Sequence, residues 1–267
     1  MLIIAIGDNG PEKETIIMAV HPIYQFRAEL CDYKPKMWRT FQVANNISIA
    51  RLGYILMSMF EMEASHLFSF EVPTQLNLNN YFRQEYRNDK EILAKIIDET
   101  RKEEVVRFQI GHDWEEYAVD DNHKTYDAAK NKIKDIVSGY GDQMVFTYDF
   151  GDGWHIHLFL EDIIIDKDLP GKELPRVLAG AGYGIIENCG GVWGLKEIAK
   201  AFKSKKGRKY KEFCEWLGVE ELDLLSFDVE DANLRVKKIP RIYTDIYEKM
   251  LEPTKQSIDF LERKYKK

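Results

Sequence analysis

Apolar and polar residues alternate over residues 23–31 and again over residues 37–43. Successive side chains of a strand point to opposite faces, so this period of two predicts two β-strands with one buried face each. Pro35 lies between the two segments, and we expect them to pair antiparallel. The same pattern predicts strands over residues 66–72, where Pro73 ends the run, and over residues 105–110.

The period changes to that of a helix after residue 48. Ser48 is a suitable N-cap, and the residues that follow place one apolar stripe on a helix, which we predict to face the core. Thr125 and Gly139 predict the start and end of another helix. The pattern predicts further helices over residues 91–101, 192–202, 210–217 and from about 255, whereas the Asn-rich residues 74–90 predict a loop or an insertion.

Residues 143–165 give the strongest hairpin signal, and the length of the turn decides which side chains face each other. A two-residue loop would place Phe150 and Tyr148 opposite histidines. A three-residue loop, residues 151–153, offers glycines for a left-handed position and matches apolar residues with one another. The predicted pairs are therefore Phe150 with Trp154, Tyr148 with Ile156, Phe146 with Leu158, and Met144 with Leu160.

This register would bring polar groups together on the opposite face. Asp149 becomes the neighbour of His155, Thr147 that of His157, and Asp152 lies on the turn. The carboxylates and imidazoles of Asp149, Asp152, His155 and His157 could hold a divalent metal, and Asp149 could instead orient His155 as a general base. The competing interpretation, which we favour from sequence alone, is that they form the solvated face of an amphipathic hairpin.

Two other places carry candidate chemistry. Cys189 stands among glycines just before a predicted helix, where a thiol can become nucleophilic, although a structural cysteine is the commoner case. Lys205, Lys206 and Arg208 belong to a basic run over residues 200–211 that could contact nucleic-acid phosphates, or could simply be the solvated face of two helices.

Composition narrows the picture. The 267 residues, 45% hydrophobic and 31% charged, suit one or two globular domains, and the net charge of −7 does not indicate a nucleic-acid binder at the level of the whole chain. Three scattered cysteines exclude a disulfide framework, and the short apolar start at residues 1–6 predicts neither a signal peptide nor a membrane span. We therefore expect a cytoplasmic protein with no membrane partner.

Several motifs resemble the plasmid pRiA4b ORF-3-like family over residues 22–235, and the most specific is Tyr-Asp-Phe-Gly-Asp-Gly-Trp at residues 148–154. The N-terminal matches are Ile23-Tyr24-Gln25, Trp38-Arg39, and His66-Leu67 with Phe70. The later matches are the segment 175–180, Glu187-Asn188-Cys189-Gly190-Gly191, Trp193-Gly194, Trp216-Leu217-Gly218, Phe227-Asp228 and Asn233-Leu234. The resemblance implies an α+β fold and relatives carried on plasmids and insertion sequences, but it implies no settled activity.

We therefore predict an α+β protein with a mixed or largely antiparallel sheet packed against helices. The predicted division is an N-terminal segment (1–21), a main domain (22–235, with 71–104 as an insertion) and a helical, basic C-terminal extension (236–267). The leading hypothesis for function is a non-enzymatic interaction or binding module linked to mobile elements, with nucleic acid or another protein as partner. The alternative is a metal-dependent hydrolase that uses the hairpin cluster, with His66 as a further candidate.

Overall fold

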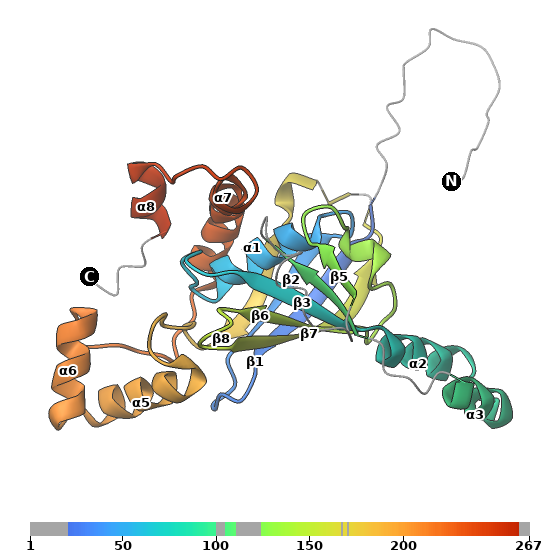
Figure 1. The fold of residues 1–267 in the computed structure, drawn as a ribbon, viewed down its shortest axis with the longest axis horizontal. Coiled ribbons are helices and arrows are strands. Elements are labelled where there is room, and N and C mark those ends of the chain that lie inside the picture. Colours follow the sequence, from blue (N-terminus) through green and yellow to red (C-terminus); the bar gives the residue numbers. More distant parts are fainter. Residues whose placement is uncertain (1–20, 100–104, 111–123, 167, 170, 262–267) are drawn as a thin grey trace, which may run out of the picture.

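The computed structural model describes residues 21–99, 105–110, 124–166, 168–169 and 171–261. An eight-stranded mixed sheet lies at its centre, with strand order β5-β4-β3-β6-β7-β1-β2-β8 (Figure 1). Of these pairs only β4–β5 is parallel. The strands are β1 (Ile23–Leu30), β2 (Trp38–Ala44), β3 (Phe68–Pro73), β4 (Val105–Gln109), β5 (Lys124–Asp127), β6 (Gln143–Tyr148), β7 (Trp154–Ile164) and β8 (Arg176–Ala181).

Helices cover and extend this sheet, so the α+β prediction is confirmed. The helices are α1 (Ile49–Met59), α2 (Thr74–Glu85), α3 (Lys90–Glu99), α5 (Gly191–Ser204), α6 (Arg208–Leu217), α7 (Val229–Tyr247) and α8 (Lys255–Leu261). Short 3-10 turns, η1 (Ile133–Asp135) and η2 (Gly171–Glu173), complete the described elements. Figure 1 shows α2 and α3 projecting from one end of the sheet, and α5 and α6 lying toward the other.

Helix α1 begins where the sequence predicts, because the Ser48 hydroxyl accepts a hydrogen bond from the backbone N–H of Arg51 at 3.1 Å. Its burial, however, extends beyond one stripe. A Cβ at Gly53 would lie 2.6 Å from the Phe68 ring of β3, so the helix sits directly on the sheet. On its other side the ring of Tyr54 stacks on Tyr247 of α7, with centroids 5.7 Å apart. Helix α1 is therefore enclosed by the sheet and α7.

Helix α7 was not predicted, because Pro240 suggests a boundary and instead lies inside the helix. The predicted division at residue 235 therefore falls within a continuous helix. Tyr243 and Tyr247, on the far side of that division, are buried and donate hydrogen bonds to the backbone carbonyls of Met62 and His66. The first part of the predicted C-terminal extension thus belongs to the main core.

Two further predictions are wrong. Residues 74–85 form helix α2, and Asn77 joins it to strand β6: the Asn77 amide donates to the Gln143 carbonyl at 3.0 Å and accepts from its N–H at 2.8 Å. Thr125 does not cap a helix, since it lies in strand β5. The apolar residues Ile133 and Val137 that suggested that helix are buried in and beside a single 3-10 turn.

The buried guanidinium of Arg39 fixes the far edge of the sheet. It donates hydrogen bonds to five backbone carbonyls, at 2.8–3.1 Å: those of Trp38, Met59, Ala181, Gly182 and Tyr183. The guanidinium carbon, Cζ, also lies 3.9 Å from the centre of the Phe227 ring. Because an arginine is expensive to bury without partners, this set of bonds specifies how β2, the end of α1 and the chain after β8 meet.

The hairpin of β6 and β7 has the predicted faces but not the predicted register. Tyr148 pairs with Trp154 and Phe146 with Ile156, so the turn comprises residues 149–153 instead of 151–153. The shift of two residues keeps the apolar faces together, as the period of two requires. It removes Phe150 from the strand, and Phe150 is 53% exposed.

This register predicts opposite outcomes for two phenylalanines of one hairpin. Phe146→Ala should lower the free energy of unfolding by about 3–5 kcal/mol, because its ring is fully buried, whereas Phe150→Ala should change it by about 0.5 kcal/mol or less. Urea unfolding of both variants measures the difference. Equal destabilisation by the two substitutions would contradict this register and support the three-residue turn at 151–153.

Candidate functional site

The turn between β6 and β7 is built around Asp149. Its backbone is left-handed (φ 55°), and its Oδ1 accepts hydrogen bonds from the N–H groups of Gly151 at 3.0 Å and Asp152 at 3.3 Å. The N–H of Gly153 donates to the Asp149 carbonyl at 2.7 Å. An aspartate side chain that bonds to the backbone two residues on stabilises a tight turn and tolerates a positive φ. This is why the turn begins two residues earlier than predicted.

The predicted pair of Asp149 and His155 is therefore wrong. His155 lies opposite Thr147, whose hydroxyl is 3.0 Å from its Nδ1, and His157 lies opposite Val145. Asp149 instead places Oδ2 3.4 Å from the Nε2 of His66. His66, named only as a further candidate, is thus the imidazole that meets the carboxylate.

The predicted metal cluster is also corrected. Among the residues that the structure describes, no group of three or more His, Cys, Asp or Glu side chains is arranged to hold a metal ion. His157 is half-buried, and its ring centroid lies 4.2 Å from that of Phe159. Burial lowers the pKa of His157, which favours its neutral form. The hairpin does not bring Asp149, Asp152, His155 and His157 together as ligands.

A buried carboxylate, Glu187, joins the segments around the turn. Its Oε1 accepts hydrogen bonds from the Tyr148 hydroxyl and the N–H of Glu63, both at 2.6 Å, and its Oε2 accepts one from the Ser65 hydroxyl. His66 Nε2 lies 4.0 Å from Oε2. Burial, and then the charge of Glu187, raise the pKa of Tyr148, so its hydroxyl remains a donor. We call Ser65, His66, Tyr148, Asp149 and Glu187 the Glu187 cluster.

The glycine-rich loop before α5 packs against the same turn. A Cβ at Gly191 would lie 2.5 Å from the carbonyl oxygen of Asp152, and Gly191 has a φ of +65°, so a glycine is required there. The neighbouring Cys189 is half-buried, and burial, followed by the charge of Asp152, raises the pKa of its thiol to about 12. Cys189 therefore remains a thiol at neutral pH and is not an activated nucleophile.

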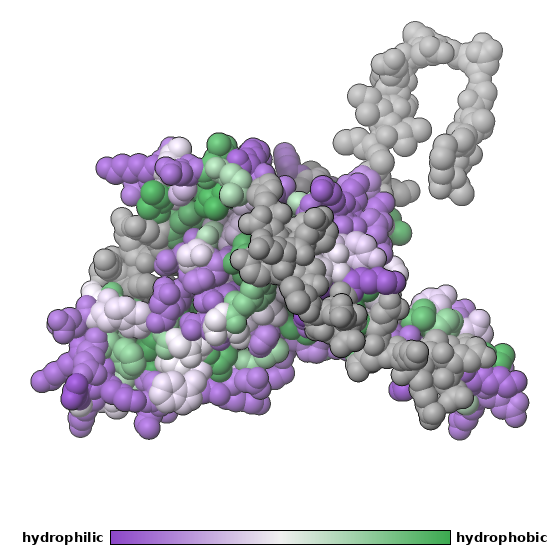
Figure 2. Space-filling view, in the orientation of Figure 1, coloured by the Kyte–Doolittle hydropathy of each residue, from purple (hydrophilic) through white to green (hydrophobic). Residues whose placement is uncertain are grey.

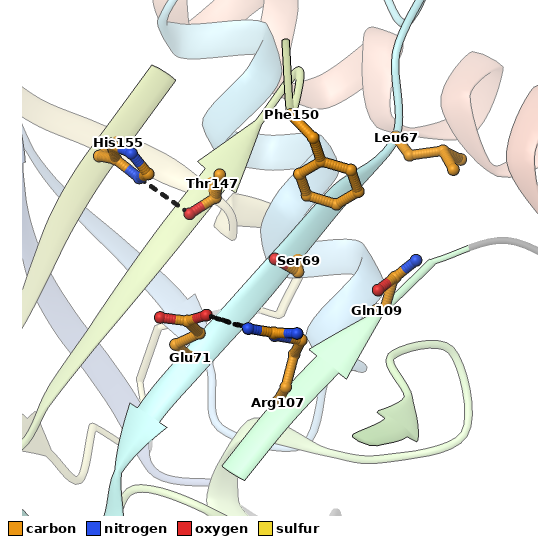
Figure 3. Close-up of a pocket in the computed structure, with 8 residues that line it drawn as sticks. All are labelled: Leu67, Ser69, Glu71, Arg107, Gln109, Thr147, Phe150 and His155. Carbon is orange, nitrogen blue, oxygen red and sulfur yellow. Dashed lines mark hydrogen bonds and ion pairs between the residues drawn. The ribbon is translucent and has the colours of Figure 1, made fainter. Parts of the chain in front are cut away.

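Beside the turn, the polar face of the sheet carries a hollow of about 570 Å³ (Figure 3). We call it the sheet hollow. It is lined by Leu67, Ser69, Glu71, Arg107, Gln109, Thr147, Phe150 and His155. These residues come from β3, β4, β6 and β7 and from the ends of the adjoining loops, and Figure 3 shows their side chains on one side of the strands.

The one positive and the one negative side chain that line the sheet hollow neutralise each other. The Arg107 guanidinium donates to Oε1 of Glu71 at 2.8 and 3.2 Å, so the one arginine is matched by the one glutamate. Exposed Phe150 and Leu67 add apolar surface at its margin. The hollow therefore offers hydroxyl, carboxamide and imidazole groups beside an aromatic ring.

The basic run is paired with acids to a greater extent than its sequence suggests. Lys205 lies 2.5 Å from Glu221, and Arg208 lies 2.6 Å from Glu212. Lys206 is exposed. Figure 2 shows hydrophilic residues over the outer end of α5 and α6, as the interpretation of a solvated face expects. The nucleic-acid role of Lys205, Lys206 and Arg208 remains a prediction.

Sequence reasoning missed Glu187 as a central residue and did not find Glu71 or Arg107. Glu187 stands in one of the quoted motifs, but its partners come from positions more than 30 residues away along the chain. Glu71 and Arg107 face each other only because β3 and β4 pair antiparallel. The sequence predicts a strand on each side but not their pairing, because residues 71–104 were interpreted as an insertion.

Comparison with known proteins places the chain in a family. The model of the plasmid pRiA4b ORF-3-like protein family matches residues 22–235, so the chain belongs to this family, as its motifs predict. A crystal structure of a protein of unknown function from Methanosarcina mazei matches with a TM-score of 0.60 and 22% sequence identity, covering 80% of this chain and 98% of that one. It shares the fold. No curated protein matches this chain.

Within the described ranges, no helix combines the length and the apolar character needed to cross a bilayer.

Because its pKa is raised, the thiol of Cys189 should react slowly with alkylating reagents. In native protein near pH 8, its alkylation by iodoacetamide should be about a hundredfold slower or more than in the denaturant-unfolded chain, because the thiolate is the reacting form. Peptide mass spectrometry distinguishes it from Cys31 and Cys214. Alkylation of native Cys189 at the unfolded rate would show that the thiol is activated or open to solvent.

Proposed function

We propose that this protein is a non-enzymatic binding module that recognises another protein through the sheet hollow. The observation that carries the proposal is the hollow itself, a polar depression of about 570 Å³ with Phe150 and Leu67 exposed at its margin. Protein recognition sites combine an exposed aromatic or arginine anchor with hydrogen-bonding groups around it. The hollow provides both.

The roles of the candidate catalytic residues support binding over catalysis. The Asp149 carboxylate holds the turn by accepting hydrogen bonds from two backbone N–H groups, and Glu187 holds the chain by accepting bonds from three donors. A carboxylate that accepts two or three hydrogen bonds from its own chain has a structural role. Together the two carboxylates hold the β6–β7 turn, and the turn places Phe150 beside the hollow.

Charge favours a protein partner over a nucleic acid. Phosphate recognition depends on unmatched cations, whereas Arg107 in the hollow is balanced by Glu71. The basic run outside the hollow is partly neutralised in the same way, through Lys205 with Glu221 and Arg208 with Glu212. A neutral, amphipathic hollow is suited to the side chains of a protein segment.

Two broader expectations belong to this proposal. The family description names a plasmid reading frame, and this supports a role connected with mobile elements. A cytoplasmic location is supported by the cysteines, since Cys31, Cys189 and Cys214 are all free and a reducing compartment keeps thiols in this state.

Selection of binding peptides from a random library tests the proposal. Purified protein should enrich peptides whose affinity falls about tenfold or more on Phe150→Ala and on Arg107→Gln, because an interface loses most of its energy at a few anchors. Fluorescence anisotropy measures each affinity.

Tyr140→Ala is the matched control, since Tyr140 is an aromatic residue that is 65% exposed and does not line the hollow. The Tyr140→Ala variant should bind the selected peptides with the same affinity as the unchanged protein. The proposal fails when the selected peptides bind the Phe150 and Arg107 variants normally, or when single-stranded oligonucleotides bind in the hollow and no peptide does.

A further inference from the structure

A second hollow, of about 590 Å³, lies away from the sheet hollow, between the turn that joins β1 to β2, helix α5 and the segment 222–225. Figure 1 shows this turn beside α5, below the sheet. We call it the lysine hollow. Its lining comprises Tyr33, Lys34, Pro35, Ala199, Lys200, Phe202, Lys203 and residues 222–225.

The walls of the lysine hollow are apolar. Tyr33, Phe202 and Leu224 are each at least 95% buried and form part of the core, so their positions are fixed by packing. Leu225, at the margin, is 63% exposed. An isolated exposed leucine is ordinary, but one beside a cavity with aromatic walls extends an apolar surface that a ligand can cover.

Three cations surround this apolar surface. Lys34 comes from the β1–β2 turn, and Lys200 and Lys203 come from one side of α5, three residues apart. None of the three forms an ion pair with a carboxylate among the residues that the structure describes. The lysines just outside differ, since Lys205 and Lys209 pair with Glu221 and Glu197.

The acidic residue in the lining does not cancel this charge. Asp223 uses its Oδ1 to accept a hydrogen bond from the Leu225 N–H at 2.9 Å, which fixes the local turn. One carboxylate of the lining faces three ammonium groups, and Glu197, whose charge interacts with that of Lys200, is already bonded to Lys209; the lysine hollow therefore carries an excess of positive charge although the whole chain carries −7. This local reversal of sign selects for an anion.

We propose that the lysine hollow binds a hydrophobic organic acid, with its apolar body over the exposed Leu225 at the margin of the apolar walls and its carboxylate among Lys34, Lys200 and Lys203. The volume is in the range of pockets that enclose a small organic molecule. Exposed Leu225 and the aliphatic stems of the lysines supply the apolar area that a ligand can bury, and the ammonium groups favour a ligand with an anionic end. This site is independent of protein recognition at the sheet hollow.

Calorimetric titration with decanoate tests the inference, with decanol and acetate as the two partial ligands. Decanoate should bind one to one, and more tightly than decanol or acetate, because only decanoate uses both the walls and the lysines. The double substitution Lys34→Gln/Lys203→Gln should weaken decanoate binding by about three- to tenfold while leaving decanol binding unchanged.

Lys206→Gln is the matched control, because Lys206 is an exposed lysine of the same basic run that does not line the hollow. Leu225→Ser provides a second variant at an exposed position and should weaken both decanoate and decanol. The inference is overturned when decanoate does not bind, when decanol binds as tightly as decanoate, or when the double lysine variant binds decanoate like the Lys206 variant.

Discussion

The burial of the Glu187 carboxylate is the constraint on which the arrangement around the site depends. A buried carboxylate is stable only when donors surround it, and here the donors come from Tyr148 at the end of β6 and from the chain just before β3. Strand β3, the β6–β7 turn and the loop before α5 must therefore meet at one point. The positions of Phe150 and of the sheet hollow follow from that meeting.

Arg39 imposes a second condition of the same kind. Three of its five carbonyl partners belong to residues 181–183, and the other two are those of Trp38 and Met59, so the guanidinium holds the chain after β8 against β2 and the end of α1. Only a few residues later the same segment delivers Glu187. The two buried charges thus fix both ends of one short connection between β8 and α5. Apolar packing forms the core, and these polar contacts select how its segments are joined.

The sequence predicts those features that depend on local periodicity. Strands β1 to β4, β6 and β7, the Ser48 cap of α1 and the apolar faces of the hairpin are found where predicted, because burial imposes the period directly, whereas the short strands β5 and β8 were not predicted. The hairpin register is missed because Asp149 stabilises a longer turn of the same parity. Helix α7 is missed because Pro240 is tolerated inside it. At the site, His66 is recognisable as a candidate, but Glu187 becomes central only through partners that are remote in sequence.

A double-mutant cycle between Tyr148 and Glu187 tests the central claim most directly. The free energy of unfolding is measured by urea denaturation for Tyr148→Phe, for Glu187→Gln and for the double variant. Because the two side chains share one buried hydrogen bond, the account predicts a coupling free energy of about 1–3 kcal/mol. Strictly additive effects of the two substitutions would contradict it, since they would show that the carboxylate does not hold the end of β6.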